Sequence, residues 1–205
     1  MSRDGQKTEV IRSFIALPIN DEVRAELDRL QKHLRHSGAH VSWVCTGNIH
    51  LTLAFLGDVF EPRVAGLASV LDDVGRRIPP FRFEVAQVGA FGSPRSPRVV
   101  WAGVDEVSGA LAELHRELVL GLAGLDISLE DRPFRPHLTV GRVRSRRGLA
   151  ELTSAMASVN NSRFGWVEAG RVLLMRSWLE PQGARYDVLH ASFLTGVKQH
   201  GGQSD

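Results

Sequence analysis

The sequence lacks several features that secreted and membrane-bound proteins depend on. It contains a single cysteine, Cys45, so the chain cannot form an internal disulfide. No apolar run approaches the roughly 18 residues that a membrane-spanning helix needs. Residues 1–7 are mainly polar and contain no apolar core of a signal sequence. These absences predict a cytoplasmic protein that is not inserted in a membrane.

The chain also lacks an excess of charge of one sign. It has 25 Lys and Arg residues against 23 Asp and Glu residues, a net charge of +2, which excludes a polycation that binds nucleic acid over its whole surface. The hydrophobic fraction of 43% is that of a soluble globular protein. At 205 residues the chain can bury one substantial core. We therefore expect one domain over residues 12–195, with flexible ends at residues 1–11 and 196–205.

Basic residues are nevertheless concentrated in one stretch of the second half. The stretch contains six arginines: Arg132, Arg135, Arg142, Arg144, Arg146 and Arg147. Such a cluster is typical of a solvated face, but it also attracts phosphate or nucleic acid. The charge pattern alone leaves both interpretations open.

Short apolar runs alternate with helical patterns along the chain, which predicts mixed α and β structure. Helices are expected over residues 21–34, from near residue 62 to before residue 79, and over residues 108–122 and 149–156. Strands are expected over residues 12–18, 41–44, 50–56, 81–88, 99–104, 137–143, 168–178 and 186–193. Asn20 or Asp21 is the expected cap of the first helix, and residues 92–97 form the most linker-like stretch.

This order of elements contains a repeat. In the first half a helix leads toward a strand that carries His50-Leu51-Thr52-Leu53. In the second half a helix leads toward a strand that carries His137-Leu138-Thr139-Val140. Two related lobes that face each other would bring both tetrapeptides to one cleft.

The chemistry of the two tetrapeptides follows from strand geometry. Residues two apart on a strand face the same side, so each histidine shares a side with its threonine while the apolar residues face the other side. An imidazole exchanges protons near neutral pH, and a hydroxyl donates a hydrogen bond to an anionic oxygen. Two such strands supply a general acid, a general base and two phosphate ligands, which is what in-line cleavage of a cyclic phosphodiester needs. No metal or other cofactor is required.

Arg142 is the leading candidate for a cation that stabilises negative charge on the phosphorus. It lies five residues after His137, which places it on the opposite side of a regular strand. A role for Arg142 therefore requires a bulge or the end of the strand.

The motifs resemble those of a known family. His50 lies within NIHLTLAFLG and His137 within FRPHLTVGR, and the chain also contains RSFIALP and RVVWAGV. Over residues 12 to about 195 these segments are similar to the RNA 2′,3′-cyclic phosphodiesterases, also called 2′-5′ RNA ligases, of the 2H phosphoesterase superfamily. The resemblance implies an α+β fold with two pseudo-twofold-related lobes of antiparallel sheet, helices packed outside, and an active site in the central cleft.

The resemblance also implies an activity and residue roles. The expected reaction is hydrolysis of an RNA-terminal 2′,3′-cyclic phosphate to a 2′-phosphate, with reversible ATP-independent 2′-5′ ligation. His50 would be the proton donor and His137 the proton acceptor. Apart from the resemblance, we expect the protein to be a monomer. Phe14, Trp43 and Tyr186 are candidates for an aromatic residue that stacks on the terminal base.

Other functions remain as alternatives. The substrate could be a small cyclic nucleotide or an ADP-ribose cyclic phosphate, or the chain could bind RNA without catalysis. His33, His36 and His40 have spacings that suit a metal, but no neighbouring Cys, Asp or Glu completes the set, and a solvated face is expected. Cys45 is expected to be an inert thiol.

Overall fold

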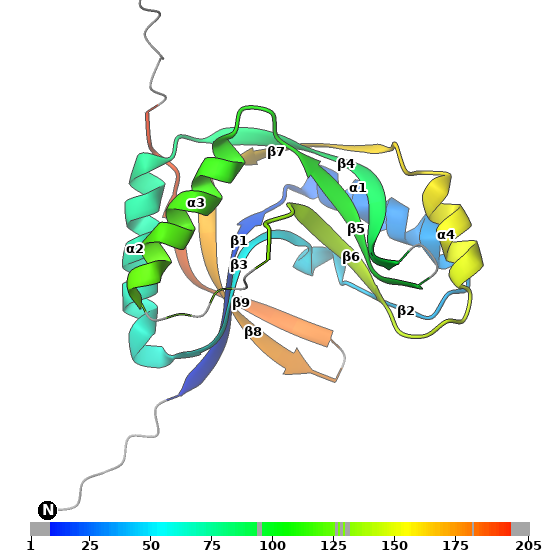
Figure 1. Ribbon diagram of the computed structural model, residues 1–205, viewed down its shortest axis with the longest axis horizontal. Helices are drawn as coiled ribbons and strands as arrows, with labels where there is room; N and C mark the ends of the chain where they lie inside the picture. Colours follow the sequence, from blue (N-terminus) through cyan, green and yellow to red (C-terminus); the bar gives the residue numbers. More distant parts are fainter. Residues whose placement is uncertain are drawn as a thin grey trace, which may run out of the picture.

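A curled antiparallel sheet with helices on its outside forms the body of the protein (Figure 1). The computed structural model describes residues 9–93, 96–125, 127, 129, 132–181 and 183–197. Within these ranges the sheet has nine strands. They are β1 (Val10–Pro18), β2 (Val41–Trp43), β3 (His50–Phe60), β4 (Phe81–Ser93), β5 (Ser96–Asp105), β6 (His137–Val143), β7 (Arg163–Ala169), β8 (Arg171–Glu180) and β9 (Gly183–Phe193).

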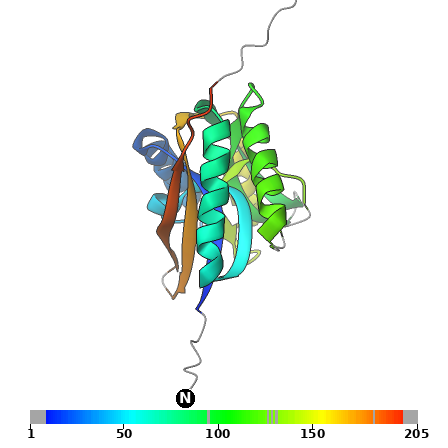
Figure 2. The same cartoon turned by 90° about the vertical axis from the view of Figure 1, so that its left-hand side faces the viewer.

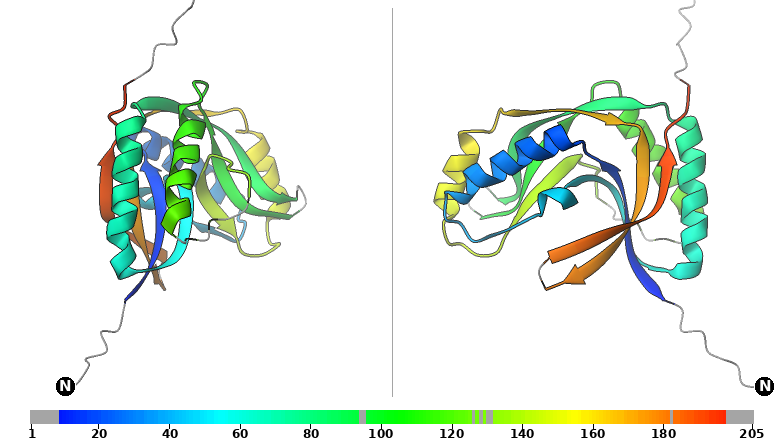
Figure 3. Two further views of the ribbon diagram at one scale, coloured as in Figure 1. Left: turned by 60° about the vertical axis from the view of Figure 1, so that its left-hand side comes forward. Right: turned by 180° about the vertical axis from the view of Figure 1, so that it is seen from behind.

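Helices cover the two halves of the sheet separately. The α-helices are α1 (Asp21–Arg35), α2 (Val64–Arg77), α3 (Ala110–Leu122) and α4 (Leu149–Ala157), and the short 3-10 turns are η1 (Thr46–Asn48), η2 (Glu61–Arg63) and η3 (Ala123–Leu125). Figure 2 shows α2 and α3 side by side along the half that contains β8 and β9. The pair α1 and α4 covers the half that contains β4 and β7, on the opposite flank (Figure 3).

The strand order reveals the internal symmetry. It runs β7-β4-β5-β6-β3-β1-β8-β9, with β2 paired beside β6. The two motif strands, β6 and β3, are the two central strands, and each continues outward through three further strands. The helix that follows β1 packs on the β7 half, and the helix that follows β5 packs on the β9 half beside α2. The predicted α+β fold of two related antiparallel lobes with helices outside is confirmed.

The first helix forms for the reasons that the sequence indicates. The side chain of Asn20 accepts a hydrogen bond from the backbone N–H of Val23 at 3.1 Å, which caps the helix. The apolar residues that recur every three or four positions are all buried: Val23, Leu27, Leu30 and Leu34. Their burial against the sheet supplies most of the stability of this helix, because an isolated helix of this length is marginal in water.

Two predictions about the strands are wrong. The linker-like stretch at residues 92–97 is the end of a hairpin: β4 continues to Ser93 and β5 begins at Ser96, and these two serines are paired. Residues 94–95 lie outside the described residues. The single strand expected over residues 168–178 is two strands separated at Gly170. Ala169 pairs with Phe81 near one edge of the sheet, whereas Arg171 pairs with Phe193 at the other edge, so the chain crosses between the two halves at this glycine.

The predicted flexible ends lie mostly outside the described residues, which exclude residues 1–8 and 198–205. At the N-terminal side β1 begins at Val10, two residues before the expected boundary. At the C-terminal side the N–H of Gly196 donates to the carbonyl of Ile78 at 3.0 Å, so the chain is still attached to the end of α2 there. No helix in the described ranges is long and apolar enough to cross a membrane.

Candidate active site

The two motif strands meet at a pair of leucines in the middle of the sheet. Leu51 of β3 pairs with Leu138 of β6 in antiparallel register, and both side chains are fully buried on the helix side. The histidine and threonine on either side of each leucine therefore face the other, concave side of the sheet. Because the strands are antiparallel, His50 lies toward Thr139, and Thr52 lies toward His137. The site has the twofold arrangement that the repeat predicts.

Aromatic rings surround the His50 imidazole. The ring of Phe14 stacks on it with centroids 4.7 Å apart and planes inclined by 22°. The ring of Tyr186 meets it edge-on with centroids 5.4 Å apart. This environment withdraws the imidazole from water, and burial is the main cause that lowers the pKa of His50. The positive charge of His137 lowers the pKa of His50 further.

The imidazole of His137 also contacts an aromatic ring, which comes from β4. The ring of Phe91 meets its imidazole edge-on with centroids 4.7 Å apart. Burial lowers the pKa of His137, and the positive charge of Arg142 lowers it further. Burial and these charges thus favour the neutral form of both imidazoles.

A backbone carbonyl orients each imidazole in the same way. Nδ1 of His50 lies 2.7 Å from the carbonyl oxygen of Asn48, and Nδ1 of His137 lies 2.7 Å from the carbonyl oxygen of Arg135. A carbonyl only accepts, so each Nδ1 carries the proton and donates it. Each Nε2 is thereby the nitrogen left to exchange a proton with a ligand.

A bulge in β6 brings Arg142 to the concave side. Thr139 pairs with Trp101 of β5, but the next pair is Gly141 with Val100, so Val140 has no partner on β5. One extra residue reverses the alternation of side chains beyond it. Arg142 consequently shares the side of Thr139 and is exposed, and its charge acts on both His137 and Tyr186. The bulge that a role for Arg142 requires is present.

The three aromatic candidates have different positions. Phe14 is only 4% exposed, because its ring packs between His50, Phe55 and Tyr186. Tyr186 is partly exposed beside His50 and can still offer ring surface to a ligand. Trp43 lies on the helix side, beneath the guanidinium of Arg35 at 5.2 Å from the ring centroid, and is not brought to the site.

Two aromatic residues near His137 were not predicted from the sequence. Phe91 lies in β4 beyond the strand expected over residues 81–88 and just before the linker-like stretch. Trp101 pairs with Thr139 in β5, and its ring lies over Gly89, where an added Cβ would come within 2.3 Å of the ring. A glycine within a strand often marks the close approach of another group, but only the pairing of β4 with β5 identifies that group as Trp101.

The other histidines and Cys45 form no comparable cluster in the described part of the chain. His33 contacts the hydroxyl of Ser158, His36 contacts the carbonyl of His33, and His40 contacts the hydroxyl of Ser145. Among the described residues no three His, Cys, Asp or Glu side chains lie close enough together to hold a metal ion. Cys45 is exposed.

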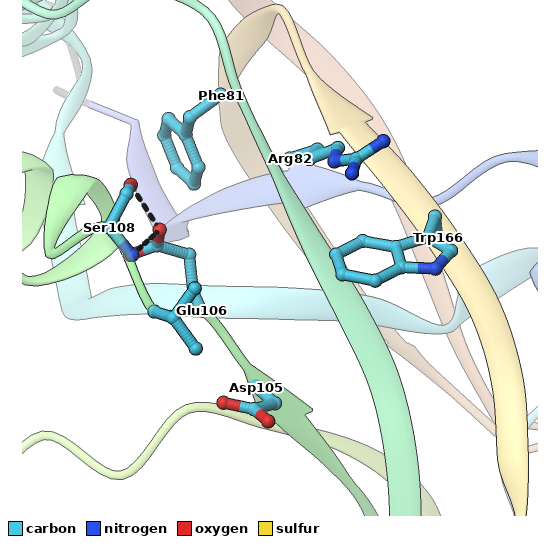
Figure 4. Close-up of a pocket in the computed structure, with 7 residues that line it drawn as sticks. Phe81, Arg82, Asp105, Glu106, Ser108 and Trp166 are labelled. Carbon is cyan, nitrogen blue, oxygen red and sulfur yellow. Dashed lines mark hydrogen bonds between the residues drawn. The ribbon is translucent and has the colours of Figure 1, made fainter.

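A hollow of about 250 Å³ lies away from the histidines, between the start of β4, the end of β5 and β7 (Figure 4). Asp105 and Glu106 both line it, and Glu106 accepts hydrogen bonds from the N–H groups of Ser108 and Leu111 and so caps the start of α3. The guanidinium of Arg82 lies over the ring of Trp166, 4.6 Å from its centroid. Glu106 and Arg82 are thus engaged within the chain, and the hollow contains no histidine, so the histidine pair remains the candidate site.

Comparison with known proteins agrees with the repeat and the geometry. The family described as LigT like Phosphoesterase matches the chain twice, over residues 17–101 and residues 103–186, one match for each motif. An RNA 2′,3′-cyclic phosphodiesterase of Thermotoga maritima is 38% identical over 182 residues, which cover 88% of this chain and 94% of that protein. One of Methanothermobacter thermautotrophicus is 34% identical over 176 residues, with 86% and 95% covered.

Solved structures show the same fold. The crystal structure of the protein TT0787 from Thermus thermophilus matches with a TM-score of 0.77 and 30% identity, covering 91% of this chain and 99% of that one. The crystal structure of E. coli LigT complexed with 3′-AMP matches with a TM-score of 0.74 and 27% identity over the same shares of the two chains.

Proposed function

This chain belongs to the LigT-like phosphoesterase family, and we propose that it hydrolyses the 2′,3′-cyclic phosphate at an RNA end with His50 and His137 as the acid–base pair. The observation that carries the proposal is the arrangement of the two imidazoles. They come from strands paired at Leu51 and Leu138, they lie on the same concave side of the sheet, and each has its Nδ1 bonded to a backbone carbonyl, which leaves Nε2 to act on a ligand.

The reaction needs one proton removed and one proton supplied. A water molecule attacks the phosphorus opposite the 3′ oxygen, and the P–O3′ bond breaks to leave a 2′-phosphate. His137 takes the proton of the water on its Nε2, and His50 gives the proton from its Nε2 to the departing 3′ oxygen. The two histidines exchange protonation states in one turnover and return to the starting pair through solvent.

Arg142 supports this polarity. Its charge lowers the pKa of His137, so His137 is favoured as the neutral base. The free site favours the neutral form of His50 as well, but a phosphate anion between the rings favours a proton on one of them. Burial lowers the pKa of both rings, and the charge of Arg142 further disfavours a proton on His137, which supports His50 as the donor.

The remaining groups bind the phosphate and the nucleoside. Thr52 and Thr139 lie on the concave side, and their hydroxyls donate hydrogen bonds to the non-bridging oxygens, where negative charge grows in the transition state. Arg142 supplies the positive charge. Tyr186 offers a partly exposed ring beside His50 on which the terminal base stacks, while buried Phe14 supports the imidazole.

Removal of either imidazole tests the proposal. His50→Ala and His137→Ala are each expected to lower kcat on an oligonucleotide with a 2′,3′-cyclic phosphate by about 10²- to 10⁴-fold, the usual contribution of a general acid or base. His40→Ala, which removes an exposed imidazole bonded to Ser145, is the matched control and keeps the activity. A folded variant of either site histidine with near wild-type turnover would refute the two-histidine mechanism.

An RNA end is favoured over a small cyclic nucleotide because the six arginines between residues 132 and 147 are all exposed, on β6 and on the segments directly before and after it. They offer contacts to phosphates upstream of the terminal one. We expect a higher kcat/KM on a short oligonucleotide than on a 2′,3′-cyclic mononucleotide, and a KM for the oligonucleotide that rises with salt. Equal efficiency on both substrates at low salt would exclude the preference for RNA.

A further inference from the structure

The bulge in β6 needs its own support, because it interrupts the sheet beside the candidate site. The carbonyl of Val140 has no partner on β5. On its other side β6 changes neighbours at the same point: it pairs with β3 at Leu138 and with β2 from Gly141 onward. A buried carbonyl at such a junction is costly unless it is hydrogen-bonded.

A buried side chain of α1 occupies this junction. Gln31 is 3% exposed, on the apolar side of the helix. Its Nε2 donates to the carbonyl of Val140 at 2.9 Å and to the carbonyl of Val44, just after β2, at 2.7 Å. The N–H of Val44 also donates to the Val140 carbonyl at 3.1 Å. One side-chain amide thus joins both strands where their pairing is interrupted.

The residue after the bulge is fixed from the same side. An added Cβ on Gly141 would lie 2.7 Å from Cγ1 of Val41 and 2.9 Å from Cε3 of Trp43. Position 141 therefore faces the packed helix side and accepts only glycine without movement of its neighbours. Gln31 holds Val140, and Gly141 packs against β2, so the next residue, Arg142, faces the concave side of the sheet.

We propose that Gln31 is a positioning residue for catalysis: its bonds to the Val140 and Val44 carbonyls hold the β6 bulge that turns Arg142 toward His137. This inference rests on the proposed function for its effect on turnover. Its effect on the geometry of β6 is independent of that function. Gln31 lies on the opposite side of the sheet from the cleft and acts only through the backbone.

Gln31→Met tests the proposal because it keeps the length and volume of the side chain and removes both donors. Without them β6 relaxes toward regular alternation, and Arg142 moves away from His137. Since the charge of Arg142 lowers the pKa of His137, the pKa of His137 should rise in Gln31→Met, as it should in Arg142→Ala. NMR titration of the His137 ring protons in the intact protein measures this without substrate.

A double-mutant cycle measures the same coupling in turnover. Gln31→Met should lower kcat/KM by about tenfold in the wild-type background and by less than about twofold when Arg142 is already alanine. Leu27→Val is the matched control: it shortens a buried side chain one turn earlier in α1, removes no polar contact, and should leave the His137 titration unchanged. Gln31→Asn, whose amide is too short to reach both carbonyls, replaces Gln31→Met if that variant does not fold.

The outcomes separate this inference from the proposed function. An unchanged His137 titration in a folded Gln31 variant, or equal losses in the two Arg142 backgrounds, would overturn the positioning role. Full activity of the His50→Ala or His137→Ala variants would overturn the proposed mechanism, and the titration would still show whether Gln31 holds the bulge.

Discussion

Backbone carbonyls, and not carboxylates, orient the two histidines. A carboxylate on Nδ1 would stabilise the imidazolium and raise its pKa, whereas the carbonyls of Asn48 and Arg135 only partly offset the effect of burial. Each histidine also lies near another positive group, His137 for His50 and Arg142 for His137. Both pKa values therefore lie below the ordinary 6.5 of a histidine.

The pH profile should reflect these lowered pKa values. Activity is lost at low pH as the base gains its proton and at high pH as the acid loses its proton, so kcat/KM follows a bell with its optimum below pH 6.5. Removing the charge in Arg142→Ala raises the pKa of His137 and should shift the acid limb to higher pH. An optimum well above pH 7, or an unshifted acid limb in Arg142→Ala, would contradict this account of the site.

The threonines should contribute to catalysis without contributing to the fold. Thr52→Val and Thr139→Val keep the β-branched shape that suits a strand and remove the hydroxyl donor. We expect each to lower kcat/KM by about tenfold or more, with an unchanged melting temperature. Thr153→Val is the control, since that hydroxyl bonds to the Leu149 carbonyl on the surface of α4. If Thr52→Val and Thr139→Val lost no more activity than Thr153→Val, the two threonines would have no role in catalysis.

At the scale of elements, α2 packs closely against β9 because residue 75 of the helix is a glycine. An added Cβ on Gly75 would lie 2.5 Å from the carbonyl oxygen of Phe193 and 2.6 Å from Oγ of Ser192. Gly75→Ala should therefore lower the free energy of unfolding by about 1–3 kcal/mol through overpacking. The added methyl group forces α2 away from β9 at the edge of the sheet. Thermal or urea denaturation measures the change.

Gly66 in the same helix is the matched comparison. Its nearest neighbour for an added Cβ is Cδ2 of Leu125 at 3.6 Å, an ordinary contact. Gly66→Ala should raise the free energy of unfolding by up to about 1 kcal/mol, because alanine favours the helix. Equal effects of the two substitutions would show that helix propensity, and not the contact with β9, decides the stability at both positions.

The elements that the sequence predicts correctly are those whose pattern is local. The spacing of Leu27 and Leu34 defines α1, and the alternation in each His-Leu-Thr motif defines its strand. The missed features depend on distant partners. The break at Gly170 arises because β7 and β8, which are consecutive in the chain, pair in opposite halves of the sheet. The β6 bulge depends on Gln31, which is far from β6 in the sequence. The motif histidines were predictable, whereas Phe91 and Trp101 reach the site through pairings that no local pattern shows.

At the scale of the whole molecule, the two lobes are not two halves of the chain. One lobe is built from β1, β3, β8 and β9, so it uses both ends of the described sequence, and the other uses β4 to β7. The helix that follows β1 covers the lobe of β4 to β7, whereas the helix that follows β5 lies beside α2 on the lobe of β8 and β9. Neither lobe can bury its core without the other. We therefore expect a single cooperative unfolding transition, with the activity lost at the same denaturant concentration as the secondary structure.

This interleaving also determines whether the site can be shared between chains. Leu51 and Leu138 pair within one sheet, so both histidines come from one monomer. A mixture of the His50→Ala and His137→Ala variants should show only the sum of their residual activities, even after the two are unfolded and refolded together. Light scattering should give one chain per particle. If monomers exchanged lobes, the refolded mixture would recover up to about a quarter of wild-type activity, because half of the dimers would be mixed and each would hold one intact site.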